Sequence, residues 1–144
     1  MPMKVAKILI SKAIIYYSLK GNTKGIIDNI DTTGYEVIDL SNNININFNK
    51  YDLILIGTST YGRGIPPRPF FEIRGDLYAL KNKKIGLFGS GNTHYEYFCG
   101  ALDLLEELLK EKNEILFKFK FEGYPKKRDI EEFKQIINKI NNEY

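Results

Sequence analysis

The 144-residue chain has one cysteine, one histidine and no tryptophan. The single cysteine, Cys99, cannot form a disulfide within the chain, and one histidine cannot build a histidine-based metal site. Apolar runs are also short, and none approaches the ~20 residues that a membrane-spanning helix needs. These absences exclude disulfide scaffolds and zinc enzymes, and we expect no metal site and no membrane partner.

The charge balance is only slightly basic. Lys and Arg total 21 and Asp and Glu total 18, which gives a formal net charge of +3. The basic residues are spread along the chain without a recognition motif, so we expect no nucleic-acid partner. The first residues lead into strand-like sequence without a small-residue cleavage site, which favours a cytoplasmic protein. The length and the 43% of apolar residues suit a single domain over residues 1–144.

Short apolar runs alternate with helical patterns along the chain. The strand-like runs cover residues 13–17, 35–40, 53–57, 85–88 and 115–121. Two amphipathic helices are indicated by Leu102, Leu105, Leu108 and Leu109, and by Ile130, Phe133, Ile137 and Ile140. This alternation predicts an α/β fold, with a five-stranded parallel sheet covered on both faces as a three-layer α/β/α sandwich.

Three segments are harder to interpret. A helix between Asn22 and about Ile30 would be short for a crossover connection. Residues 41–49 are rich in asparagine and resemble a loop with a few apolar anchors. Residues 7–10 either extend the first strand or form an added arm.

The loop after the first strand suits a phosphate. Ligands of open parallel sheets bind outside the carboxyl ends of the strands, so the loops at those ends are the informative ones. This loop reads Ser18-Leu19-Lys20-Gly21-Asn22-Thr23 and combines two hydroxyls, a glycine and an immediate helix start. It lacks the Lys-Ser/Thr pair of a Walker A loop. Ordinary helix capping by the same side chains is the alternative.

Aromatic residues follow the third and fourth strands. The third strand leads into Thr58-Ser59-Thr60-Tyr61-Gly62-Arg63, and the fourth into Ser90-Gly91-Asn92 and then Tyr95, Tyr97 and Phe98. A glycine-rich turn with one packed tyrosine is the simpler interpretation of the third-strand loop alone. Beside a phosphate loop, however, two aromatic loops predict a slot for a flat ring that carries a phosphate tail.

These loops resemble those of the short-chain flavodoxins, and the similarity extends over nearly the whole chain. The family pattern Ser/Thr-x-x-Gly-Asn-Thr matches residues 18–23, and Ser-Thr-aromatic-Gly matches residues 59–62. The most specific match is Tyr-x-Tyr-Phe-Cys-Gly-Ala-x-Asp at residues 95–103, and Gly-x-Pro stands at residues 123–125. The resemblance implies the flavodoxin-like strand order 2-1-3-4-5.

The resemblance also implies non-covalently bound FMN and one-electron transfer at low potential, with no catalytic residue. Residues 18–23 would hold the phosphate, Thr58 and Ser59 would lie near the ribityl chain, and Tyr95 and Tyr61 would flank the ring. The peptide between Gly62 and Arg63 would face the flavin N5 position. The complete implied set is Ser18, Leu19, Lys20, Gly21, Asn22, Thr23, Thr58, Ser59, Thr60, Tyr61, Gly62, Arg63, Ser90, Gly91, Asn92, Tyr95, Tyr97, Phe98 and Cys99. The implied partners are a flavodoxin reductase or similar donor and a protein acceptor, with the chain itself a monomer. Cys99 would serve by packing at a helix start.

The charges depart from the family pattern, because typical flavodoxins are acidic around the flavin. Here Lys20 and Arg63 bring positive charge into two loops, and Asn92 replaces a common aspartate. We therefore expect a second one-electron potential that is less negative than usual for the family. The alternative is that these exposed charges are screened by salt and act mainly in partner docking.

Two other functions remain open from the sequence. A flavodoxin-like activator of the manganese form of class Ib ribonucleotide reductase is similar at residues 90–92, 121–123 and 129–130, and has a short first helix. It delivers oxidant from reduced FMN and oxygen. A flavin-free binding module on the same fold is the other alternative.

Overall fold

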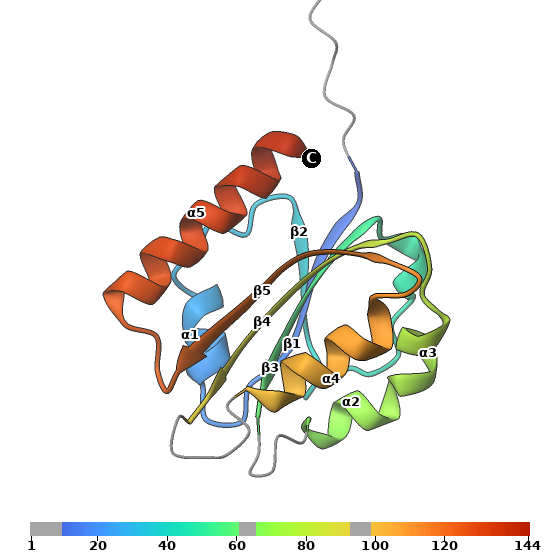
Figure 1. Cartoon of the computed structure of the whole chain (residues 1–144), viewed down its shortest axis with the longest axis horizontal. Coiled ribbons are helices and arrows are strands. Elements are labelled where there is room, and N and C mark those ends of the chain that lie inside the picture. The colour runs from blue at the N-terminus through green and yellow to red at the C-terminus, as the bar shows by residue number, and fades with distance from the viewer. Residues whose placement is uncertain (1–9, 61–65, 93–98) are drawn as a thin grey trace, which may run out of the picture.

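The computed structural model describes residues 10–60, 66–92 and 99–144 (Figure 1). Within them, five parallel strands form one sheet of order β2-β1-β3-β4-β5. The strands are β1 (Lys12–Tyr17), β2 (Tyr35–Asp39), β3 (Leu53–Ser59), β4 (Lys84–Gly91) and β5 (Glu114–Glu122). The predicted strand order is confirmed. Because β1, β3 and β4 are parallel neighbours, the loops that follow them meet at one edge of the sheet.

Helices cover both faces of the sheet (Figure 1). The helices are α1 (Asn22–Ile27), α2 (Arg68–Glu72), α3 (Arg74–Ala79), α4 (Gly100–Leu109) and α5 (Lys127–Glu143), with a 3-10 turn η1 (Phe48–Lys50). One core packs α1 and α5 against side chains such as Ile14 and Leu55, and the other packs α2, α3 and α4 against Ile15 and Ile56. Successive strand residues therefore serve opposite cores, and the predicted three-layer sandwich is confirmed.

An aromatic cluster fills the core beneath α5. Phe133 lies on α5, and its ring centroid is 5.0 Å from that of Phe88 on β4 and 5.4 Å from that of Phe119 on β5. Both Phe88 and Phe133 are fully buried. These contacts fix α5 across β4 and β5, and so fix the strand ends that lead into the site.

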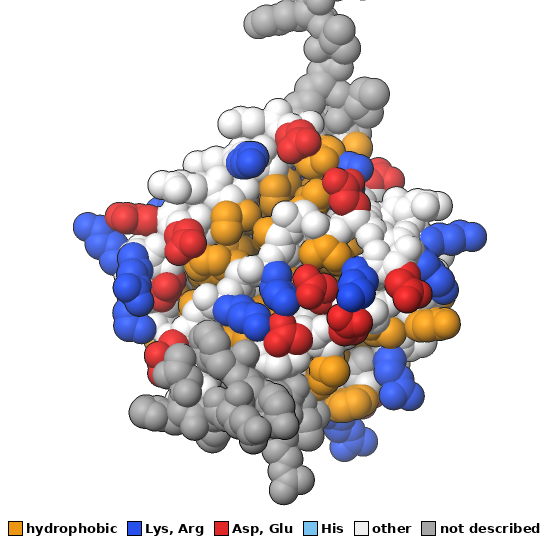
Figure 2. Space-filling model, viewed as in Figure 1, with side chains coloured by type: hydrophobic (Ala, Val, Ile, Leu, Met, Phe, Trp, Pro, Cys, Tyr) orange, Lys and Arg blue, Asp and Glu red, His pale blue; other side chains and the backbone are white. Residues whose placement is uncertain are grey.

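A network of charged side chains connects α4 to β5. Lys118 on β5 donates to Asp103 at 2.8 Å and to Glu106 at 3.0 Å, and Lys120 lies 2.9 Å from Asp103. In the view of Figure 2, basic and acidic side chains alternate over these two elements. The network therefore lies on the surface, where solvent weakens each ion pair.

The structure refines the uncertain segments. Helix α1 ends at Ile27, so the first crossover is as short as the sequence indicates. The segment 41–49 contains no strand, and Phe48 at its end is a buried anchor. Strand β1 begins at Lys12, which leaves residue 10 outside it, and residues 1–9 lie outside the described part. Helices α2 and α3 were not predicted, because five- and six-residue helices show too little of the helical period. In the described ranges, no helix is long and apolar enough to cross a membrane.

Candidate functional site

One buried side chain connects the start of α1 to the ends of β3 and β4. The Thr23 hydroxyl, in the first turn of α1, donates to the Thr58 carbonyl oxygen at 3.1 Å. It also lies 3.2 Å from the Ser90 hydroxyl. Thr23 and Thr58 are fully buried, and Ser90 nearly so. The structure therefore brings together three predicted site residues, one from the start of α1 and one each from the ends of β3 and β4, at the carboxyl edge of the sheet.

The loop of residues 18–21 turns the chain from β1 into α1. Gly21 has a φ of +81°, a left-handed conformation that glycine adopts without a steric cost. The Ser18 hydroxyl accepts a hydrogen bond from the Lys24 backbone N–H at 3.1 Å. Ser18 thus pairs with one first-turn N–H of α1, whose N-cap residue is Gly21. The side chains of Leu19 and Lys20 are exposed, so this loop presents its backbone and one cation to the solvent.

The Thr23 hydroxyl points into the protein. Its single proton is donated to the Thr58 carbonyl, so the Ser90 hydroxyl must be the donor in the Thr23–Ser90 contact. Both oxygens therefore have their hydrogen-bonding needs met inside the fold. The backbone N–H of Thr23 is different, because N–H groups in the first turn of a helix have no partner within that helix. In this structure, the Thr23 hydroxyl bonds Thr58 and Ser90, and the Thr23 backbone N–H is not used by α1.

The β3 end is held close to the β4 end. The Thr60 backbone N–H donates to the Ser90 carbonyl at 3.2 Å. The Thr58 hydroxyl donates to the Ser59 carbonyl at 2.8 Å. A Cβ on Gly89 would lie 2.2 Å from the Thr58 carbonyl oxygen, so only glycine permits this approach. The Thr60 hydroxyl is buried and has no hydrogen-bond partner within the described ranges.

Cys99 begins helix α4 with a left-handed backbone, at a φ of +52°. It is fully buried, and its sulfur lies within hydrogen-bonding distance of two carbonyl oxygens, 3.6 Å from that of Gly89 and 3.8 Å from that of Phe121. Burial raises the pKa of the thiol to about 11, so it stays protonated near neutral pH. These contacts agree with the packing role expected for Cys99.

Several predicted site residues cannot be placed. Tyr61, Gly62 and Arg63 of the second loop lie outside the described residues, as do Tyr95, Tyr97 and Phe98 of the third. Ser90, Gly91 and Asn92 are described, and the Gly91 carbonyl accepts a hydrogen bond from the Gly123 N–H at 3.1 Å. This bond joins the loop after β5 to the same edge.

Two glycines that shape this edge are not among the site residues predicted from the sequence. Gly89 permits the close approach of β3 to β4, and Gly25 on α1 faces the ring of Tyr124. A Cβ on Gly25 would lie 2.6 Å from the ring of Tyr124, so this glycine lets the loop after β5 pack on α1. A glycine inside a strand or helix is the available sequence signal, because it often marks a close backbone approach.

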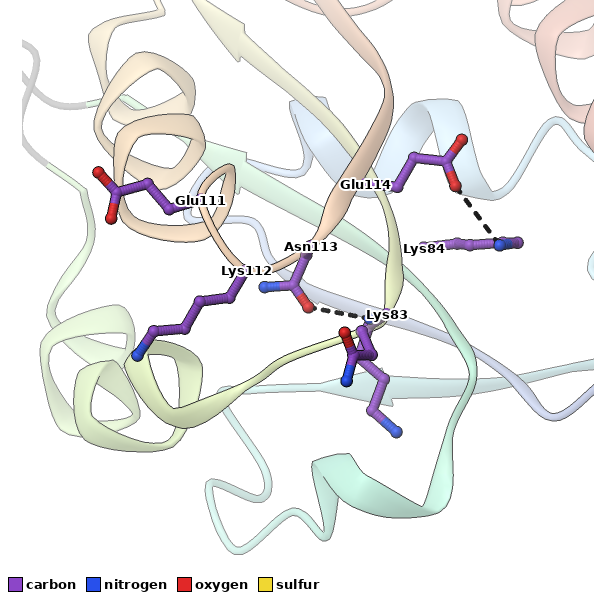
Figure 3. Close-up of a pocket in the computed structure, with 7 residues that line it drawn as sticks. Lys83, Lys84, Glu111, Lys112, Asn113 and Glu114 are labelled. Atoms are coloured by element: carbon purple, nitrogen blue, oxygen red, sulfur yellow. Dashed lines mark hydrogen bonds and ion pairs between the residues drawn. The ribbon is translucent and has the colours of Figure 1, made fainter.

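A polar cavity of about 410 Å³ lies at the opposite end of the sheet (Figure 3). It is lined by Asn82, Lys83, Lys84, Glu111, Lys112, Asn113 and Glu114. The Lys83 backbone N–H donates to the Asn113 side chain at 3.0 Å, and Lys84 pairs with Glu114 at 3.4 Å. Since β4 and β5 begin at Lys84 and Glu114, the cavity is separate from the carboxyl edge. Its polar groups join the loop that precedes β4 to the loop that precedes β5.

The fold and the carboxyl edge define a class of protein. In a doubly wound sheet of order 2-1-3-4-5, the ligand crevice lies outside β1 and β3, where the strand order reverses. The Thr23–Thr58 hydrogen bond lies at this point. The chain is therefore a doubly wound α/β protein with its candidate ligand site at the switch point.

Comparison with known proteins identifies the family. The flavodoxin family model matches residues 14–134, so the chain belongs to the flavodoxin family. It is 34% identical to probable flavodoxin 2 of Bacillus subtilis strain 168, over 93% of this chain and 91% of that protein. It is 30% identical to a flavodoxin of Maridesulfovibrio salexigens, over 81% of this chain and 89% of the relative. The crystal structure of oxidised flavodoxin 2 from Bacillus cereus superposes with a TM-score of 0.80 at 29% identity, over 92% and 99% of the two chains.

Family membership confirms the predicted class, an electron-transfer protein that uses FMN. The chemistry of such a protein resides in its cofactor, and the chain supplies binding, orientation and electrostatics.

Proposed function

We propose that the loops after β1, β3 and β4 hold FMN non-covalently, and that the chain transfers single electrons between protein partners. The observation that carries this proposal is the Thr23 hydroxyl, which is 3.1 Å from the Thr58 carbonyl and 3.2 Å from the Ser90 hydroxyl. This contact supports the proposal because it holds the start of α1 and the ends of β3 and β4, from which the predicted binding loops begin, at one edge. The proposal treats the chain as one domain that acts as a monomer.

The phosphate is assigned to the loop of residues 18–23. Gly21 turns the backbone, and the first-turn N–H groups of Asn22 and Thr23 are donors that α1 itself does not use. The exposed ammonium of Lys20 adds a positive charge to the loop. Backbone N–H groups with a nearby cation are a donor set that suits a phosphate dianion.

The ribityl chain and ring are assigned to the other two loops. The Thr60 hydroxyl fits this assignment, because it is buried at the site edge without a partner among described residues and can bond a polar ligand. Ser59 and Asn92 border the same edge. Tyr61 and Tyr95 are assigned to the two faces of the ring on the family resemblance, together with Gly62, Arg63, Tyr97 and Phe98. Ser90, Gly91 and Cys99 are assigned to the shape of the third loop.

When bound, FMN supplies the electron-accepting chemistry. The chain holds the cofactor by its phosphate, orients it against the strand ends and sets the local charge. The proposed partners are a flavodoxin reductase or a similar donor and a protein acceptor, in the cytoplasm. The activator of class Ib ribonucleotide reductase is set aside, because neither the described contacts nor the relatives reported above favour it.

An anaerobic reductive titration of the FMN-loaded protein, followed by absorbance, tests this function. Two well separated one-electron steps are expected, with the one-electron-reduced form accumulating between them. Two steps that nearly coincide would argue against a single-electron carrier. Failure of the protein to bind FMN at all would overturn the proposed site as well.

A further inference from the structure

Basic side chains gather at one corner of the carboxyl edge. A helix that follows a parallel strand begins near the carboxyl end of that strand, so α1 and α5 begin at the same edge. The two helices also share one face of the sheet, because Ile26 of α1 and Phe133 of α5 belong to the same core (Figure 1). The surface where both helices begin is called here the basic corner, and its exposed residues are Leu19, Lys20, Tyr124, Lys126, Lys127 and Arg128.

The loop after β5 is attached to this corner by two contacts. The Gly123 N–H donates to the Gly91 carbonyl at 3.1 Å, which holds the loop at the end of β4. The ring of Tyr124 packs on α1 at Gly25, where an added Cβ would lie 2.6 Å from the ring. The start of α5 is therefore held beside the start of α1, next to the proposed phosphate loop.

The stability of the fold does not explain these cations. Within the described ranges, no ion pair engages Lys20, Lys127 or Arg128. By contrast, Lys24 on α1 pairs with Asp28 at 3.0 Å. Lys127 and Arg128 are also the first two residues of α5, where the positive end of the helix dipole disfavours a cation. Their charges are therefore available to a partner.

Two exposed apolar side chains accompany the cations. Leu19 is 53% exposed and Tyr124 is 60% exposed. Protein interfaces commonly place aromatic and aliphatic contacts at the centre and charged groups at the rim. A small patch of this composition suits the weak, short-lived complexes that electron-transfer proteins form.

Acidic residues limit the extent of the corner. The exposed Glu131 and Glu132 follow the cations directly along α5. Figure 2 shows basic side chains over the start of α5 with acidic side chains beside them. A nucleic acid or an anionic membrane presents a continuous negative surface, which these carboxylates would repel. A protein with a local acidic patch is the better fit.

We propose that the basic corner docks an electron-transfer protein whose own docking surface is acidic. This proposal rests on the proposed function, because the partner exchanges electrons with FMN held at the same edge. Opposite charges steer the two proteins together, and Leu19 and Tyr124 supply the apolar contact. The basic corner thus determines the sign of the partner's charge, which the proposed function leaves open.

The test uses one haem protein in two charge forms as the electron acceptor. Cytochrome c is basic, and succinylation replaces its lysine ammonium groups with carboxylates and makes it acidic. The FMN-loaded protein is reduced anaerobically and mixed with each ferric form in a stopped-flow instrument. One electron passes from the reduced flavin to the haem iron, which becomes ferrous. We expect the rate constant with the succinylated form to fall as salt is added.

Lys127→Gln/Arg128→Gln removes two charges from the basic corner without changing the proposed FMN loops. At low salt, we expect its rate constant with succinylated cytochrome c to fall roughly three- to tenfold, because steering by opposite charge is weakened. The rate constant with native cytochrome c is expected not to fall. The dissociation constant of FMN and the free energy of unfolding in urea should show no loss, since neither charge is paired within the described ranges.

Lys81→Gln/Lys139→Gln is the matched control, because it removes the same net charge elsewhere. Lys81 lies before β4 and Lys139 lies near the end of α5, and both are exposed. Their distance from the carboxyl edge exceeds the range over which salt leaves a charge effective, so we expect a change of at most about twofold. Equal losses in the two double variants would show that only net charge matters and would overturn the proposal.

Three other outcomes are informative. Weaker FMN binding by Lys127→Gln/Arg128→Gln would assign the two cations to the cofactor site and overturn the docking surface. An unchanged rate constant, with lost binding to phosphatidylserine vesicles, would make the corner a membrane contact and overturn it too. A wild-type protein that binds no FMN would overturn the proposed function itself, a result distinct from any effect of these surface variants.

Discussion

At the scale of single residues, the described site requires glycine at a position where two strands approach too closely for a Cβ atom. Gly89 lies so close to β3 that an added Cβ would be 2.2 Å from the Thr58 carbonyl oxygen, and this neighbour is backbone that cannot rotate away. We therefore predict that Gly89→Ala lowers the free energy of unfolding by about 2–4 kcal/mol. Urea denaturation of the flavin-free protein measures the change.

Gly75→Ala is the control for that substitution. Gly75 lies in α3, and a Cβ there would meet no atom within 4 Å. Because alanine restricts the unfolded chain and favours the helix, this variant should be more stable by about 0.5–1 kcal/mol. Equal effects of the two alanine variants would mean that the contact between Gly89 and Thr58 does not constrain the fold.

The charge of Lys20 belongs to the same scale. Its ammonium is exposed in the proposed phosphate loop, where it would favour the more negatively charged, reduced flavin. We predict that Lys20→Gln makes the second one-electron potential more negative by roughly 10–30 mV, because an exposed charge acts weakly through water. Redox titration at low and high salt measures the shift, which salt should reduce.

Lys81→Gln is the matched control for Lys20. Lys81 is equally exposed but lies between α3 and β4, at the amino end of the sheet. Its replacement should leave both potentials unchanged. If Lys20→Gln also leaves them unchanged, its charge does not tune the flavin, and partner docking is the remaining role.

At the scale of elements, the sequence was most informative where a pattern was long. The apolar runs located all five strands, and the spacing of Leu102, Leu105 and Leu109 located the buried face of α4. Helices α2 and α3 escaped prediction because each spans less than two turns, and Pro66 and Pro67 directly precede α2. Short helices are stabilised by tertiary packing, here of Phe70 and Leu77, which a local pattern does not record.

The attachment of α4 to β5 should depend on pH. Partial burial opposes the charge of Asp103, but hydrogen bonds from Lys118 and Lys120 outweigh it and hold the pKa of Asp103 below its usual value. A carboxylate with a lowered pKa stabilises the folded state above its unfolded pKa, near 4, and loses that contribution as the pH falls through the folded value. Asp103→Asn should therefore cost roughly 0.5–1 kcal/mol at pH 7, after allowance for solvent screening, and almost nothing at pH 2.

Urea denaturation of the wild type and Asp103→Asn at both pH values checks this. Glu107→Gln is the control, because Glu107 pairs with exposed Lys110, at 2.7 Å and three residues further along the chain at the end of α4. Its effect should be near zero at either pH. A cost of Asp103→Asn that persists at pH 2 would mean that the network is not electrostatic.

At the scale of the whole molecule, the sequence predicted where the site lies better than how it is built. A parallel sheet brings the loops after β1, β3 and β4 to one edge whatever their side chains do, so position follows from topology. The direction in which a side chain points does not follow from the topology. The loop pattern predicts Thr23 as a phosphate contact, and the structure adds that its hydroxyl bonds Thr58 and Ser90 across the sheet. Only the folded arrangement of distant residues determines such contacts.

Because three loops from separate strands meet in the proposed site, FMN binding should stabilise the whole fold. A ligand that binds only the folded state adds about 2.7 kcal/mol of stability at 100 times its dissociation constant, and about 1.4 kcal/mol for each further tenfold. For a domain of this size, a stabilisation of about 2.7 kcal/mol predicts a rise of roughly 5–10 °C in the thermal midpoint of unfolding. Calorimetry over a series of FMN concentrations measures the rise, with inorganic phosphate as the control, which should cause little change. A midpoint that does not depend on FMN concentration would contradict a site shared among β1, β3 and β4.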